Sequence, residues 1–97
     1  MIIKKISEMT DADKKAFLES MKLALVKEQG ISWKEIEPKI LEEIDNTFDD
    51  EKFFKMDSEF RKNAAHARNK FGDKKPSIED YMLWLVTFAT KSEYASW

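Results

Sequence analysis

Apolar residues recur every three or four positions along most of the chain, which is the spacing of one face of an α-helix. The pattern predicts four main helices, over residues 11–29, 38–48, 50–71 and 78–92. The third is the most regular, and its apolar positions predict one continuous inward face: Phe53, Met56, Phe60, Ala64, Ala67 and Phe71. The chain has only two glycines and two prolines, a composition that favours long helices over tight hairpins.

Helix starts are marked three times by a hydroxyl followed three residues later by an acid, at Thr10–Asp13, Ser32–Glu35 and Ser77–Asp80. In such a capping box the hydroxyl accepts a hydrogen bond from the amide of the acid, and the acid accepts one from the amide of the cap residue. Pro38 follows the middle box, and a proline inside a helix removes a backbone hydrogen bond and clashes with the preceding turn. We therefore expect a short turn at residues 32–36 and a helix that begins at Pro38, since proline suits a first turn.

The residues before the first helix form a short N-terminal arm, in which Ile2, Ile3 and Ile6 are apolar. Their pattern fits a brief strand, a helical turn or a packed arm. A folded chain of 97 residues hides roughly 65% of the surface that its unfolded chain exposes, which is enough for one core. The sequence thus predicts an all-α fold, a single-domain bundle of four main helices over residues 1–97.

Composition excludes several kinds of chemistry. The chain has no cysteine, so disulfides, thiolate nucleophiles and zinc–thiolate sites are ruled out. The longest apolar runs, such as Met82 to Val86, are far too short to span a membrane, and the N-terminus lacks the apolar stretch of a signal peptide. We expect a cytoplasmic protein that does not bind membranes, with no metal site and no cofactor.

His66 is the single histidine and is the one candidate for acid–base catalysis. No acid lies within a helical turn on either side to orient it, and its neighbours are small or basic. A histidine at the surface or at the core boundary is the favoured interpretation, and an enzyme or small-ligand binder built around His66 is the weaker one. We therefore predict no catalytic residues and no enzyme activity.

Charge is segregated, although the net charge is only −2. Residues 35–51 carry eight acids and one lysine, whereas residues 61–75 carry six bases and one acid. Arg61, Arg68 and Lys75 are about seven positions apart, which predicts an exposed helix face opposite the phenylalanines. The favoured interpretation is a solvated face that balances the acidic helix, in part through intramolecular salt bridges. The alternative is a surface that binds an acidic partner or nucleic-acid phosphates.

Three tryptophans are many for a chain of this size, and Trp97 lies at the C-terminus beside Tyr94. An aromatic pair at a chain end needs a surface to pack on, because chain ends otherwise fray. That surface is either the protein's own core or a partner, since Trp, Tyr and Arg dominate interface hot spots.

Together these features predict a non-catalytic protein–protein interaction module of the inhibitor, immunity or adaptor type, a type that also occurs in phages and mobile elements. Its predicted partner-binding residues are four bases for electrostatic steering and three aromatic anchors: Arg61, Arg68, Lys74, Lys75, Trp84, Tyr94 and Trp97. The alternative prediction is a helical protein that binds nucleic acid through the Arg61–Lys75 basic face. Homodimerisation is compatible with the surplus of aromatic residues.

Overall fold

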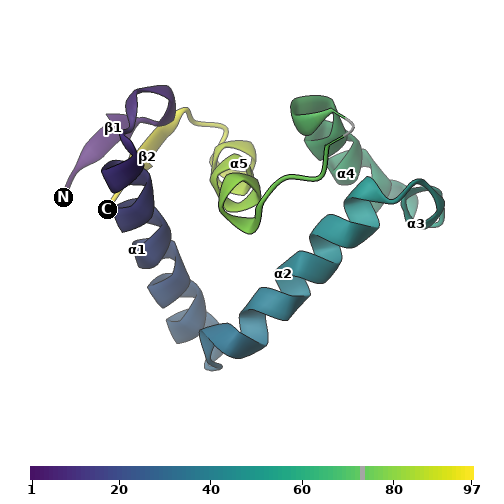
Figure 1. Ribbon diagram of the computed structural model, residues 1–97, viewed down its shortest axis with the longest axis horizontal. Coiled ribbons are helices and arrows are strands. Elements are labelled where there is room, and N and C mark those ends of the chain that lie inside the picture. The colour runs from purple at the N-terminus through teal and green to yellow at the C-terminus, as the bar shows by residue number, and fades with distance from the viewer. Residues whose placement is uncertain (73) are drawn as a thin grey trace.

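Two long helices diverge from a tight turn and form the arms of a V (Figure 1). In this computed structural model, which describes residues 1–72 and 74–97, the arms are α1 (Asp11–Gln29) and α2 (Trp33–Phe48). Gly30 ends α1 in the left-handed conformation, with φ of 67°, and its amide donates a hydrogen bond to the Val26 carbonyl. Glycine is the residue that adopts this conformation without a steric penalty, so the turn lies where the sequence places it.

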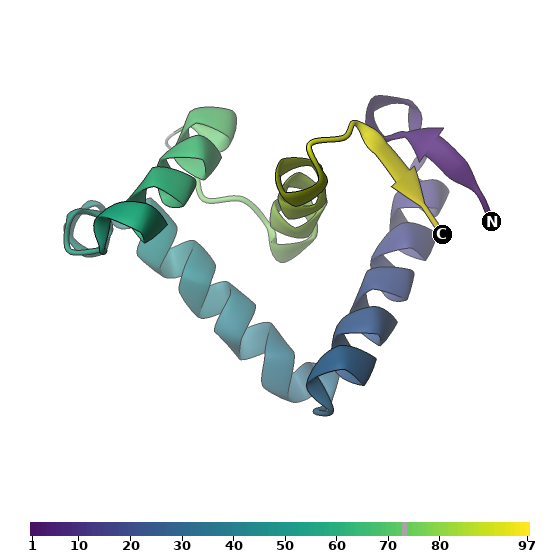
Figure 2. The ribbon, with the colours of Figure 1, turned by 180° about the vertical axis from the view of Figure 1, so that it is seen from behind.

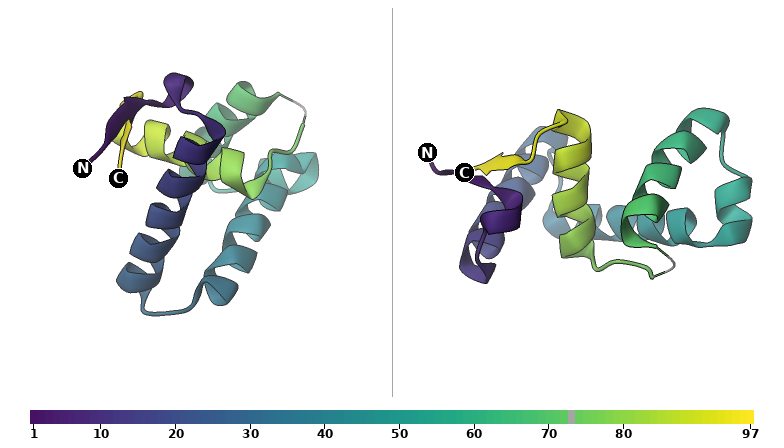
Figure 3. Two further views of the ribbon diagram at one scale, coloured as in Figure 1. Left: turned by 60° about the vertical axis from the view of Figure 1, so that its left-hand side comes forward. Right: turned by 90° about the horizontal axis from the view of Figure 1, so that it is seen from above.

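The remaining helices close the fold above the arms. After α2 the chain forms α3 (Asp50–Phe54) and α4 (Ser58–Phe71), and α4 packs back on α2. The last helix, α5 (Ile78–Thr90), lies between α1 and α4 when the molecule is viewed from above (Figure 3). α2 contacts each of the other four helices and is the central support of the domain.

The two chain ends pair with each other as strands. β1 (Ile3–Lys5) and β2 (Tyr94–Ser96) run antiparallel, with Lys4 opposite Ala95, and a 3₁₀ turn at Ile6–Glu8 follows β1. The N-terminal arm is thus both a brief strand and a helical turn. The strands lie beside the start of α1, and Figure 2 shows both termini together on that side of the molecule.

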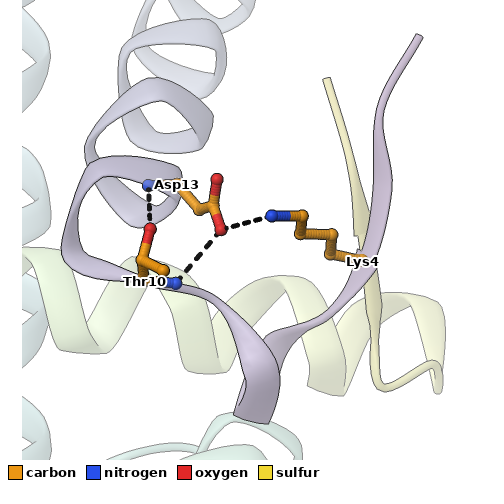
Figure 4. A network of polar contacts seen from close by, with 3 residues as sticks. All are labelled: Lys4, Thr10 and Asp13. Carbon is orange, nitrogen blue, oxygen red and sulfur yellow. Dashed lines mark hydrogen bonds and ion pairs between the residues drawn. The ribbon is translucent and has the colours of Figure 1, made fainter.

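Two of the three predicted caps form hydrogen bonds. Thr10 accepts from the Asp13 amide at 3.1 Å, and the Asp13 carboxylate accepts from the Thr10 amide at 3.1 Å, so this capping box is complete. The same carboxylate binds the Lys4 ammonium at 2.8 Å, which connects β1 to the first turn of α1 (Figure 4). The Ser77 hydroxyl accepts from the Asp80 amide at 3.2 Å at the start of α5.

The prediction of a short turn at residues 32–36 and a helix starting at Pro38 is wrong. α2 begins at Trp33 and runs through Pro38, and the Ser32 side chain makes no capping hydrogen bond. The continuous helix places Ile36 and Ile44 on one inward face, where they are 2% and 0% exposed. Burial of these side chains outweighs the backbone hydrogen bond that proline removes.

The predicted helix over residues 50–71 is also interrupted. Asp49 caps α3 by accepting from the Lys52 amide at 3.0 Å, and the helix ends after Phe54. The chain then turns, and Asp57 is the N-cap residue of α4. The turn redirects α4 back along α2, which a single straight helix does not allow.

The last helix ends at Thr90, before the predicted Ser92, because Lys91 is left-handed with φ of 54°.

The core consists of two clusters that meet on α5. The first lies between α1, α5 and the strands and includes Phe17, Leu18 and Met82. The second lies between α2, α4 and α5 and consists of Ile44, Ala67 and Tyr81. Because α5 contributes to both clusters, it holds the two halves of the V together.

Candidate functional site

Two of the openings beside α5 differ in chemistry. One, the aliphatic groove, lies between α1, α2 and α5 and has a volume of about 630 Å³. Its lining is mainly aliphatic and includes Met21, Leu25, Ile36, Ile40, Met82 and Val86. The other, the aromatic cleft, lies between α2, α4 and α5, has a volume of about 490 Å³, and is named for Phe60, Tyr81, Trp84 and Phe88.

One wall of the aromatic cleft is a row of rings along α5. Trp84 and Phe88 stack with centroids 5.0 Å apart and planes 17° apart, and Tyr81 lies 5.5 Å from Trp84. The i, i+3 and i+4 spacing of these residues on a helix brings the rings together. Phe71, on α4, meets Trp84 edge-on, with the ring centroids 6.3 Å apart. It supports the row of rings but does not itself line the cleft.

The opposite wall comes from the start of α4. Phe60 is 66% exposed, although the sequence pattern predicts it on the inward face. It shares a face of α4 with Ala64 and Ala67, but it lies in the first turn of the helix, where it lines the aromatic cleft and belongs to neither core cluster. Exposure of a large aromatic side chain at the mouth of a cleft is a feature of binding surfaces.

The rim of the aromatic cleft is acidic. Glu42 and Glu43 on α2 and Asp57 at the start of α4 line it, with Lys39 as the single cation of the lining. Burial of Tyr81, together with the nearby Glu43 carboxylate, raises the pKa of the Tyr81 phenol above its ordinary value. The phenol therefore stays neutral and adds no charge to the cleft.

Two of the six bases of the predicted basic face are paired with acids within the described part of the molecule. Arg68 pairs with Asp50, and Lys75 pairs with Asp45 at the far end of α2. The Arg68 guanidinium lies 4.6 Å from the centre of the Phe53 ring, so the prediction that it faces away from the phenylalanines is wrong. The partners in these two ion pairs are 18 and 30 residues apart in the chain. Only the folded structure brings them together.

The other predicted partner-binding residues do not gather at one place. Arg61 donates to the Met56 carbonyl at 3.3 Å, and Lys74 is exposed in the segment before α5. Trp84 lines the aromatic cleft, whereas Tyr94 begins β2 and Trp97 follows it, on the far side of α5 (Figure 1). Trp97 packs on Phe17 at 5.9 Å, and Tyr94 is 58% exposed.

His66 is exposed on α4, with its ring 5.2 Å from that of Phe88. Across the described residues, no three His, Cys, Asp or Glu side chains lie close enough together to hold a metal ion. None of the helices in this part of the chain is both long enough and apolar enough to cross a membrane.

Trp84 alone of the residues that line the aromatic cleft was in the sequence-based site, which therefore missed the acidic rim and the ring on α4: Glu42, Glu43, Asp57 and Phe60. The sequence carried one signal of the break between α3 and α4, because Asp57 and Ser58 are typical N-cap residues in the middle of an otherwise continuous helical pattern.

Comparison of the chain with protein-family models, curated proteins and solved structures found no match to any of them.

Proposed function

We propose that this protein is a non-catalytic protein–protein interaction module of the inhibitor, immunity or adaptor type, and that it binds through the openings beside α5. The main support is the accessible surface, which is 7013 Å² for a chain of 11.4 kDa. A folded monomer of this mass typically exposes about 5,800 Å². The surplus of about 1,200 Å² exceeds the ~800 Å² that each partner buries in a standard protein–protein interface.

The aliphatic groove is a suitable surface for such a partner. Its lining is predominantly aliphatic, and the methionines Met21 and Met82 adapt their shape to different apolar surfaces. Ala24 on α1 and Ala89 on α5 are exposed at the groove, and their small side chains permit close approach of a partner backbone. A partner helix or loop that inserts apolar side chains here extends the core of the domain.

Binding of nucleic acid through the Arg61–Lys75 face is the less favoured function. A phosphate that contacts Arg68 or Lys75 has to replace Asp50 or Asp45, so part of the electrostatic gain is lost. The test is the affinity for mixed-sequence DNA and RNA at low and moderate salt. Tight binding that weakens steeply with salt contradicts our preference, and absence of binding at low salt removes this alternative.

Affinity capture from the native host tests the interaction function when it is combined with groove variants. The double substitution Ala24→Glu and Ala89→Glu places two charges in the aliphatic groove at exposed helix positions. Ala16→Glu and Ala65→Glu are the matched control, because both alanines are exposed on helices and lie outside both openings. We expect the wild type and the control to capture the same protein, and the groove variant to lose it. Equal capture by all three excludes the groove as the binding surface.

A further inference from the structure

We propose that the aromatic cleft binds a lysine or arginine side chain carried by an amphipathic segment of a partner protein. This inference rests on the proposed interaction function and specifies the chemistry of the partner at one of the two openings. It follows from three features of the cleft: the ring surfaces, the acidic rim, and the way this protein binds its own cations.

The rings of the cleft offer aromatic surface to a cation, although Trp84 and Phe88 each cover one face of the other by stacking. Phe60 is 66% exposed on the α4 side, and the stacked pair of Trp84 and Phe88 lies on the α5 side. A cation within about 6 Å of a ring centre is attracted to the negative face of the ring, and tryptophan is the strongest partner. Lysine and arginine also bury their aliphatic stems on apolar surface, so both parts of such a side chain find a match here.

The rim supplies the opposite charge. Glu42, Glu43 and Asp57 are exposed, and among the described residues none of them forms an ion pair. Two cations lie nearby: Lys39 in the lining, and Arg61, which donates to the Met56 carbonyl beside Asp57. The carboxylates outnumber them, so the cleft favours a positive ligand and repels phosphates.

The protein already combines rings and carboxylates to hold cations elsewhere. The Arg68 guanidinium lies over the Phe53 ring at 4.6 Å and pairs with Asp50. The Lys22 ammonium lies 5.2 Å from the centre of the Trp33 ring and pairs with the Glu19 carboxylate at 3.7 Å. The aromatic cleft presents the same combination of groups, and none of the cations in residues 1–72 and 74–97 lies over its rings.

The cleft is also large enough for a ligand of this kind. Its volume of about 490 Å³ is within the range of sites that enclose small ligands. Its floor is apolar as well as aromatic, because Leu85 and Met56 line it. A partner segment therefore contributes apolar side chains next to its cation, which is the composition of a basic amphipathic helix.

Two labelled synthetic peptides test the inference by fluorescence anisotropy. Both are amphipathic helices with the same leucine face, and their polar positions are all lysine in one peptide and all glutamate in the other. We expect the lysine peptide to bind the wild type at least about tenfold more tightly, with an affinity that falls as salt rises.

Two variants locate the binding, each with a matched control. The triple substitution Glu42→Gln, Glu43→Gln and Asp57→Asn neutralises the rim, and asparagine keeps the capping character of residue 57. Its control neutralises three exposed acids outside the cleft, with Glu8→Gln, Glu28→Gln and Glu35→Gln. Phe60→Ala removes the ring on the α4 side, and its control is Phe54→Ala on α3, where the side chain is 67% exposed.

Support for the inference requires that the rim variant loses the preference for lysine, that Phe60→Ala weakens binding of the lysine peptide by about threefold to tenfold, and that both controls leave it unchanged. Equal binding of the two peptides overturns the inference while the proposed interaction function stands. Binding of neither peptide also overturns it, and the capture experiment on the aliphatic groove then decides the proposed function separately. Loss of lysine-peptide binding in the charge control places the attraction on the whole surface and not in the cleft.

Discussion

The ammonium group of Lys4 lies 2.8 Å from the Asp13 carboxylate, and the same carboxylate oxygen accepts a hydrogen bond from the Thr10 amide. One side chain thus completes the cap of α1 and holds β1 against that helix (Figure 4). β1 in turn pairs with β2, so the ion pair ties both ends of the chain to the first helix.

This contact predicts acid-sensitive stability. The Lys4 side chain, followed by the Thr10 amide, lowers the pKa of the Asp13 carboxyl below its ordinary value of 3.8. A lowered pKa in the folded state means that the stabilisation is present above the ordinary value and is lost as the pH falls through the folded value. We expect Asp13→Asn to be less stable than the wild type near neutral pH, with the difference disappearing in acid. Urea unfolding over this pH range measures it, and Asp11→Asn, in the same helical turn, is the control.

The three N-cap residues Thr10, Ser32 and Ser77 predict two similar effects and one smaller one. Thr10→Ala and Ser77→Ala each remove a side-chain hydrogen bond to a helix amide, and each lowers the free energy of unfolding by about 1 kcal/mol. Ser32→Ala removes no such bond and has a smaller effect. Chemical denaturation of the three variants provides the comparison. An equal loss for Ser32→Ala contradicts the absence of a capping hydrogen bond from the Ser32 side chain.

Pro38 predicts a stabilising substitution. It lies inside α2, where its nitrogen donates no hydrogen bond and its ring crowds the preceding turn. Pro38→Ala restores the backbone hydrogen bond and removes the crowding. The free energy of unfolding therefore rises by about 1 kcal/mol or more. Urea unfolding tests the change, with Lys39→Ala as a neighbouring exposed control. A loss of stability instead contradicts the expectation that Pro38 destabilises α2.

Arg68 predicts a structural cost for changing the basic face. Arg68→Ala removes the ion pair with Asp50 and the contact with the Phe53 ring, so the free energy of unfolding falls by about 1 to 2 kcal/mol. Lys62→Ala, at an exposed position of the same helix, changes it by less than about 0.5 kcal/mol. Thermal unfolding of both variants at low and high salt distinguishes them. Equal stability of the two variants contradicts a stabilising role of Arg68.

Local signals were enough to predict most of the helices. The spacing of apolar residues, the caps at Thr10 and Ser77, and the glycine at residue 30 act over a few neighbouring residues, so the sequence displays them directly. The same local logic failed at Pro38 and at the turn before Asp57, because packing against other helices decided both. The acidic residues of the aromatic cleft could not be predicted, since they come from α2 and α4 and meet only when α4 folds back.

The sequence by itself determined a mostly helical single domain, because helix spacing and capping are short-range properties. It also determined that acids and bases are concentrated in separate segments. The tertiary structure decided what those charges do: Arg68 and Lys75 are paired with acids from the preceding helices, while Glu42, Glu43 and Asp57 face an open cleft. Which charges meet depends on how α4 and α5 pack on α2, and that arrangement is set by contacts between residues far apart in the chain.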